Sequence, residues 1–106
     1  MTDYKQHRAK KMRLMILRWL REGQSFTMDI MLLQSALAQQ GVNAWDDELR
    51  EELKWLEGEK LAKIREEMGQ LIAELTPAGL DIAEGRARHK QIDRPRPGHL
   101  TVEVCG

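Results

Sequence analysis

The side chains that most often perform catalysis are few and scattered in this chain of 106 residues. Its three histidines, His7, His89 and His99, lie in the terminal segments, and none stands at a local spacing from an acid and a nucleophile. The single cysteine, Cys105, builds neither an internal disulfide nor a multi-cysteine metal site. The sequence also has no glycine-rich phosphate loop and no pair of metal ligands at helical separation. We therefore expect no enzyme activity, no metal site and no cofactor.

Charge is sorted along the chain, although 17 basic and 17 acidic residues balance to zero. The first 22 residues are basic, and the stretch 28–44 is nearly uncharged. An acidic block follows, made of Asp46, Asp47, Glu48, Glu51, Glu52, Glu57 and Glu59. A second basic cluster contains Arg86, Arg88, Lys90, Arg94 and Arg96. Each basic cluster has two interpretations, a contact surface for phosphates or an ordinary solvated surface.

The cysteine content, the hydropathy and the length predict the compartment and the number of domains. A lone thiol favours a reducing interior compartment. The apolar run 12–20 is too short and too charged for a membrane span, and no cleavage site follows it. We expect a cytoplasmic protein that does not enter a membrane. Its length suits one domain over residues 1–90, followed by an extended or flexible tail over 91–106.

Apolar spacing predicts three helices in the first half of the chain. The first runs from about residue 4 to Glu22 and is apolar on two sides, because Leu14 and Leu17 lie opposite its main stripe. That second side needs a partner, either the C-terminal helix or a second subunit. The second helix has Thr27 as its expected N-cap. The third is opened by a capping box of Asn43 and Asp46, with its buried face formed by Trp45, Leu49, Leu53 and Leu56.

After Gly58 the period changes to the alternation of two short antiparallel strands, with a turn at Met68-Gly69. Thr76 and Pro77 then open a last helix as N-cap and first residue. The prolines of "RPRPG" end any helix. The final "HLTVEV" is either a short docking strand or a mobile tail.

This order of elements resembles the winged helix-turn-helix family. The likeness is carried by "LLQSALAQQGVNAWDDELREELKWLEGEKLAKI" and "AELTPAGLDIA", and it covers roughly residues 10–88. The whole chain is similar to small winged-helix proteins of bacteriophages and prophages, most of them uncharacterised. The resemblance implies an α+β, mostly helical fold with three helices, a short β-hairpin wing, a C-terminal helix and an extended tail.

The resemblance also implies binding to double-stranded DNA, with the third helix in the major groove and the wing on the backbone. By position, the helix side chains that would face the groove are Asp47, Arg50, Glu51 and Lys54, and the wing contacts are Lys63 and Arg65. Arg86 and Arg88 are added as phosphate contacts. The expected function is a small regulatory protein that occupies a duplex, without an effector site. It would be a homodimer through the first and last helices, including Leu14 and Leu17.

The acidic third helix supports a second hypothesis. The carboxylates in its first turn stabilise the positive end of the helix dipole. They form either an ordinary solvated face or a surface that binds a basic protein. Phosphates repel them in both cases. The alternative function is a protein-interaction module that does not bind DNA, with the acidic third helix and a half-exposed Trp55 holding a basic protein.

Overall fold

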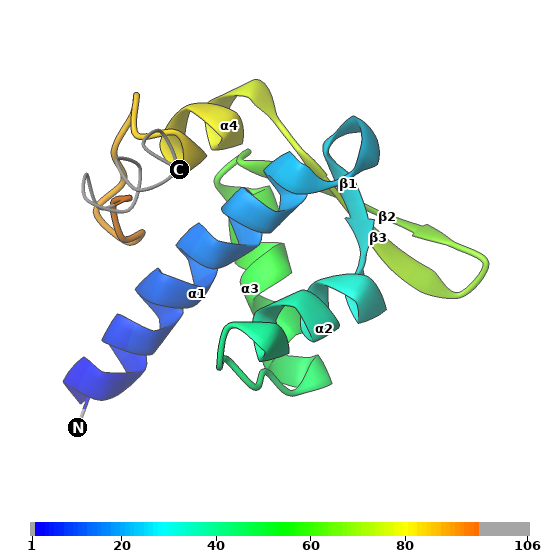
Figure 1. Ribbon diagram of the computed structural model, residues 1–106, viewed down its shortest axis with the longest axis horizontal. Helices are drawn as coiled ribbons and strands as arrows, with labels where there is room; N and C mark the ends of the chain where they lie inside the picture. Colours follow the sequence, from blue (N-terminus) through cyan, green and yellow to red (C-terminus); the bar gives the residue numbers. More distant parts are fainter. Residues whose placement is uncertain (1, 96–106) are drawn as a thin grey trace.

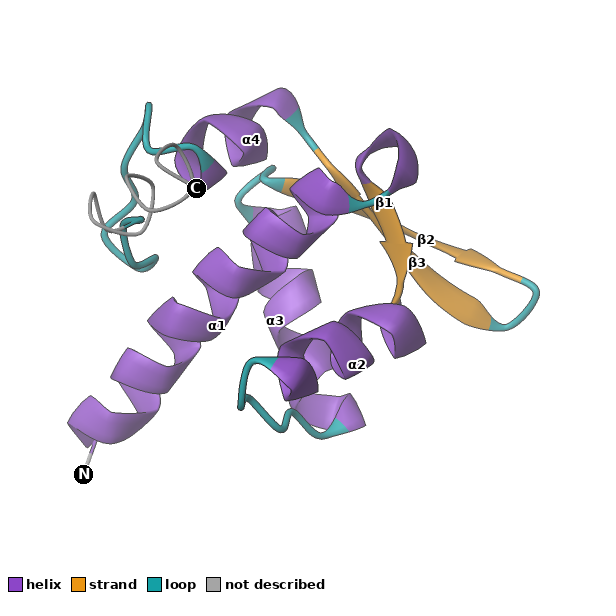
Figure 2. Ribbon diagram, viewed as in Figure 1, coloured by secondary structure: helices purple, strands orange, loops and turns teal. Residues whose placement is uncertain are grey.

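Within the described residues, four helices and a three-stranded antiparallel sheet form the fold, in the α+β, mostly helical and winged-helix-like arrangement expected from the sequence (Figures 1 and 2). The computed structural model describes residues 2–95. In chain order the elements are α1 (Thr2–Glu22), the 3-10 turn η1 (Gln24–Phe26), β1 (Thr27–Asp29), α2 (Ile30–Gln39), α3 (Asp46–Gly58), β2 (Ala62–Glu67), β3 (Gln70–Leu75) and α4 (Pro77–Ala83). The strand order is β1-β3-β2.

Strand β1 was not expected from the sequence. Met28 lies opposite Ala73 of β3, in a strand of three residues that is too short to show an alternating pattern. The expected N-cap at Thr27 is therefore wrong. Asp29 caps α2 instead, because its carboxylate accepts a hydrogen bond of 2.8 Å from the Leu32 amide.

The hairpin turn was located correctly. Glu67 lies opposite Gln70, and Met68 and Gly69 between them both have positive φ, 51° and 81°. Two consecutive positive φ values are typical of the tight turns that join twisted antiparallel strands. The hairpin projects away from the helices (Figure 1).

The start of α3 differs from the expected capping box. Trp45 is the N-cap residue, and it makes no side-chain cap hydrogen bond. The Trp45 side chain, expected to be buried, is 80% exposed, because a cap residue has extended backbone and does not continue the helical stripe. Leu49, Leu53 and Leu56 are buried as expected.

Helix α1 lies against the other elements and supplies much of the core. Ile16, Leu17 and Leu20 are fully buried, and Leu14 shows only an edge to solvent. Both apolar sides of α1 are thus covered within one chain, with α4 among the elements that cover it. None of the helices in residues 2–95 is long and apolar enough to cross a membrane.

The chain after α4 returns along α1 (Figure 1). Ile92 is only 3% exposed, and the Asp93 amide donates a hydrogen bond of 3.3 Å to the Lys10 carbonyl. The packed part of the chain therefore continues beyond residue 90, the expected domain boundary. The expected tail contacts of "HLTVEV", together with Arg96 and Cys105, lie outside the described residues.

Candidate nucleic-acid interface

The outward face of α3 presents more negative than positive charge. Arg50 is held by Asp46 one turn earlier, with 2.7 Å between Nε and Oδ2. Lys54 is exposed and has no ion pair with a described residue. Asp47 and Glu51, the other two side chains expected to face a DNA groove, are exposed on the same helix. This face would meet phosphates with little net attraction.

The wing is similarly balanced. Arg65 Nε donates to Glu67 over 2.6 Å, and Arg65 Nη1 donates to Glu74 over 3.4 Å. The hydrogen bond to Glu67 raises the pKa of Arg65. Lys63 is exposed and has no ion pair within the described chain. The structure therefore brings Arg50, Lys54, Lys63 and Arg65 onto neighbouring elements, α3 and β2, but it neutralises the two arginines.

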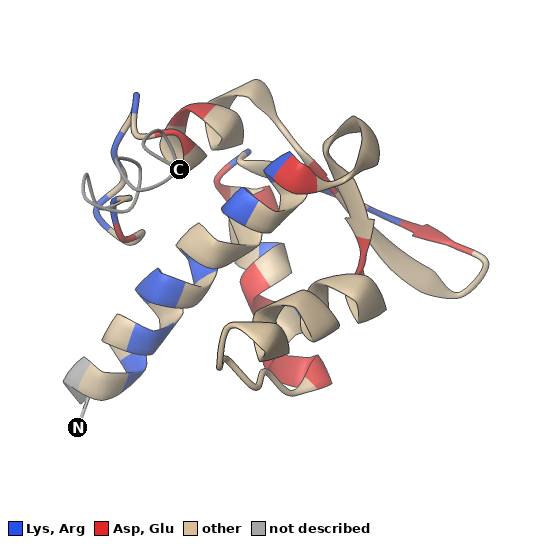
Figure 3. Cartoon of the chain, in the orientation of Figure 1, with Lys and Arg blue, Asp and Glu red and all other residues tan. Residues whose placement is uncertain are grey.

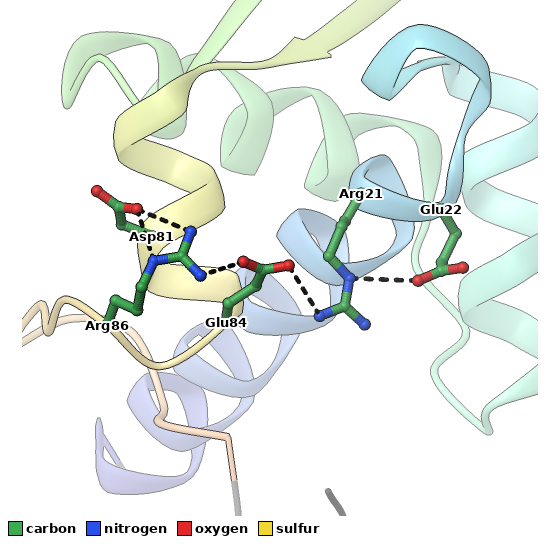
Figure 4. A network of polar contacts seen from close by, with 5 residues as sticks. All are labelled: Arg21, Glu22, Asp81, Glu84 and Arg86. Carbon is green, nitrogen blue, oxygen red and sulfur yellow. Dashed lines mark hydrogen bonds and ion pairs between the residues drawn. The ribbon is translucent and has the colours of Figure 1, made fainter. Parts of the chain in front are cut away.

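Arg86 belongs to a network at the end of α4 (Figure 4). It contacts Asp81 at 3.0 Å and also Glu84, whose other oxygen lies 3.9 Å from Arg21 of α1. The hydrogen bond to Glu84 is the main cause that raises the pKa of Arg86. Arg86 thus ties α4 to its own C-terminal turn. Its segment lies on the opposite side of the molecule from the hairpin (Figure 1), so Arg86 and Arg88 do not extend the α3–wing surface.

Two of the α3 acids have a structural role that the sequence did not reveal. Glu48 accepts hydrogen bonds of 2.8 and 3.1 Å from Arg8 of α1, and Glu52 accepts one of 2.6 Å from Arg13. The contact with Arg8 lowers the pKa of Glu48 and raises that of Arg8. The sequence carries no local signal of these two contacts, because Arg8 and Arg13 are five residues apart, whereas residues that share a helix face are three or four apart.

Trp55 is covered inside the chain. The Arg13 guanidinium carbon lies 3.9 Å from the Trp55 ring centroid, and His89 packs edge-on with ring centroids 5.1 Å apart. The Gln91 amide donates to His89 Nδ1, so the neutral ring carries its proton on Nε2, 2.9 Å from Glu59. These contacts hold the segment after α4 against α1 and α3.

A basic hollow forms where that segment meets α1. Its volume is about 400 Å³, and its lining includes Lys10, Arg88, Lys90 and Arg94, with Asp93 as the single carboxylate. None of the four cations has an ion pair with another described residue. Figure 3 shows Lys and Arg both along α1 and in the segment after α4, while Asp and Glu lie on α3 and also on α4 and the hairpin. The sequence showed both clusters but not their meeting within one chain.

Comparison with known proteins gives one family assignment. The chain is 38% identical over 66 residues to the uncharacterised protein gp26 of Escherichia phage Mu, an overlap that spans 62% of this chain and 69% of gp26. The chain belongs to the gp26 family. No family model matches the sequence, and no solved structure matches it.

The gp26 relationship supports the expected link to phage proteins at the level of origin. Because the name of gp26 states no activity, the functional argument depends on the surfaces described above. In the described part of the chain, no three His, Cys, Asp or Glu side chains are grouped so as to hold a metal ion.

Proposed function

We propose that this gp26-family protein is a small DNA-binding regulatory protein that contacts duplex phosphates mainly through the basic hollow. The observation that carries the proposal is the set of four cations gathered there from the two ends of the described chain, none of which has an ion pair with another described residue. Lys and Arg side chains that neutralise phosphates supply most of the sequence-independent affinity for DNA. The order of elements also supports a place in the winged helix-turn-helix family, whose members commonly bind DNA.

The ion pairs on α3, the wing and α4 favour a mode of DNA binding in which α3 contributes less than the basic hollow. Arg50 and Arg65 already have carboxylate partners, and a phosphate would have to displace them. Arg86 is held in the same way by Asp81 and Glu84. Lys54 and Lys63 have no carboxylate partner among residues 2–95 and would remain as minor contacts at the edge of the duplex.

The test is binding of a labelled duplex of mixed sequence, followed by fluorescence anisotropy at about 50 and 200 mM salt. For the protein carrying Lys90→Ala and Arg94→Ala, we expect weaker binding and a plot of log affinity against log salt that is shallower by about 1.8, since each lost phosphate contact removes about 0.9. The matched control carries Arg50→Ala and Lys54→Ala. It removes the same number of positive charges from α3 and should change the slope less.

The outcomes separate two modes of binding from no binding. A larger loss in the α3 control than in the Lys90 and Arg94 variant would mean that α3 and not the basic hollow leads the contact. No binding by folded protein at the lower salt would contradict DNA binding altogether.

A second candidate function is a protein-interaction module that does not bind DNA. It is favoured by the exposed acids Asp47 and Glu51 beside the exposed Trp45, a combination that suits a basic protein better than a phosphate backbone. Trp55, the residue first expected to hold such a partner, is less suitable because Arg13 and His89 cover its ring.

A further inference from the structure

A groove with an apolar wall lies beside the second half of α1. It has a volume of about 490 Å³, and its wall is formed by Leu14, Met15 and Trp19. The Trp19 indole donates a hydrogen bond of 2.9 Å to the Gln40 side chain, which fixes one side of the groove. Met15 and Trp19 are only half-buried among the described residues, so the wall has room for further apolar side chains. We call it the α1 groove.

The charges around the α1 groove do not select an occupant. Arg21 is paired with Glu22 and also lies 3.9 Å from Glu84, and Arg18 has an interaction of its own. Charge complementarity with a partner is therefore no guide here. The course of the chain beside the groove is the observation that identifies what fills it.

The described chain leads to the edge of the α1 groove. Pro95, the last described residue, is half-buried and lines a second hollow that adjoins the groove. On its other side Pro95 faces the end of α4, since a Cβ added at Gly85 would lie 3.8 Å from the Pro95 Cγ. Pro95 thus lies between α4 and α1. The second hollow and the α1 groove share four lining residues, Lys11, Leu14, Met15 and Arg18.

The chain also approaches in the direction of the groove. The Asp93 amide donates its hydrogen bond to the Lys10 carbonyl, and two residues later Pro95 lies beside Leu14, one turn further along α1. Chain and helix therefore advance together, toward Trp19. Pro95 and Pro97 favour extended backbone at the residues before them, so the sequence favours a chain that keeps this course.

We propose that the occupant of the α1 groove is the chain's own end segment, residues 96–106, which lies outside the described residues. Three apolar residues of this segment, Leu100, Val102 and Val104, alternate with Thr101 and Glu103. In extended backbone such alternation places the three apolar side chains on one face, which would cover the open wall of the groove. Burial of apolar surface from water supplies the driving force.

The end segment is long enough for this contact. The five residues from Pro95 to Leu100 span up to about 17 Å when extended. The groove follows α1 from Leu14 to Glu22, a rise of about 12 Å. Leu100 can therefore reach any point of the wall from the position of Pro95.

The contact has a consequence for assembly and none for the proposed DNA binding. It would occupy the side of α1 that includes Leu14, one of the residues expected from the sequence to join two subunits, and would leave that side unavailable for a dimer. The α1 groove and the basic hollow share no lining residue, so the cations of the hollow stay accessible to phosphate. Failure of either proposal would leave the other unchanged.

The experiment uses the single cysteine, Cys105, which follows Val104 directly and carries a nitroxide at one defined place. A nitroxide broadens the NMR signals of nearby nuclei. In the full chain labelled with ¹⁵N, we expect strong broadening of the Trp19 indole N–H signal. The Gly69 amide is the internal reference and should be unaffected, because its hairpin projects away from the helices (Figure 1).

Two matched double variants test whether the apolar residues hold the segment in the groove. The full chain carrying Leu100→Ser and Val102→Ser should have a ratio of docked to undocked segment that is lower by at least about tenfold, with weaker broadening at Trp19. The control carries Thr101→Ser and Glu103→Gln, at the polar positions of the same alternation. Its broadening should equal that of wild type.

A mixture of two preparations identifies the molecule that supplies the segment. One preparation carries ¹⁵N and no nitroxide, and the other carries the nitroxide and no ¹⁵N. Broadening at Trp19 that is absent from this mixture supports docking within one chain. Broadening of the same strength in the mixture would assign the groove to the end segment of a second copy and overturn the proposal. No broadening at Trp19 in wild type, or equal broadening in the two double variants, would also overturn it.

Discussion

The ion pair between Arg8 and Glu48 joins residues forty positions apart and lowers the pKa of the Glu48 carboxyl. A carboxyl with a lowered pKa in the folded state contributes stability above its unfolded pKa and loses it as the pH falls through the folded value. Glu48→Gln should therefore lower the free energy of unfolding at pH 7 by about 0.5 kcal/mol, the size usual for a partly exposed pair. The difference should disappear in strong acid. Urea titrations at the two pH values measure it.

Glu51→Gln is the control for Glu48→Gln, since Glu51 lies on the same helix, is exposed and has no ion pair within the described residues. The Glu51→Gln protein and the wild-type protein should have nearly the same free energy of unfolding at both pH values. An equal effect of the two variants would mean that the general acidity of α3 matters, and not the Arg8 contact.

Single residues were predictable from the sequence where their role is local. The cap at Thr76, whose hydroxyl accepts a hydrogen bond from the Gly79 amide, and the turn at Met68-Gly69 depend on neighbours within a few positions. Trp45 was wrongly predicted to be buried. Its spacing continues the buried stripe of α3, but as the N-cap residue it has extended backbone that turns its side chain out of that stripe. The partner of Glu48 was out of reach because nothing local identifies Arg8.

At the scale of elements, the start of α4 packs so closely on the chain before β2 that only glycine fits. A Cβ added at Gly79 would lie 2.2 Å from the Leu61 carbonyl oxygen and 2.8 Å from Leu75 Cδ1. Gly79→Ala should therefore destabilise the protein by about 1–3 kcal/mol, although alanine is the better helix former. Thermal unfolding followed by circular dichroism measures the change.

Gly58 provides the matched comparison at the end of α3. A Cβ there meets nothing within 4 Å, so the ordinary preference of a helix for alanine should prevail. Gly58→Ala should raise the free energy of unfolding by about 0.5 kcal/mol. Two Gly→Ala substitutions of the same sign would show that helix propensity, and not the approach of α4 to Leu61, decides the outcome at Gly79.

Elements with a clear period were recovered from the sequence, and β1 was not. The hairpin repeats its pattern over six residues on each side, whereas Thr27–Asp29 owes its conformation to pairing with Glu74, Ala73 and Ile72. Pairing across more than forty residues leaves no local pattern. The sequence therefore predicted that Thr27–Asp29 would form the N-cap and first turn of the second helix, and not a strand.

At the scale of the whole molecule, folding rearranges the charge that the sequence displays in blocks. The acidic block is divided, since Glu48 and Glu52 turn toward α1 while Asp47 and Glu51 face solvent. Lys10 and the basic cluster after α4 meet around one hollow. The sequence could show which charges exist, but only the docking of the C-terminal segment on α1 determines which of them act together.

That docking yields the last prediction, Ile92→Ala. Ile92 is the buried side chain of the segment that carries Arg88, Lys90 and Arg94, and its truncation should cost about 2 kcal/mol, the lower end for a buried isoleucine because the segment can detach locally. Once the segment detaches, the cations no longer surround Lys10, and the salt slope of duplex binding should fall by at least about 1. Urea unfolding and anisotropy titrations on the same preparation test both effects. Lower stability with an unchanged slope would mean that the cations bind phosphate without being held on α1.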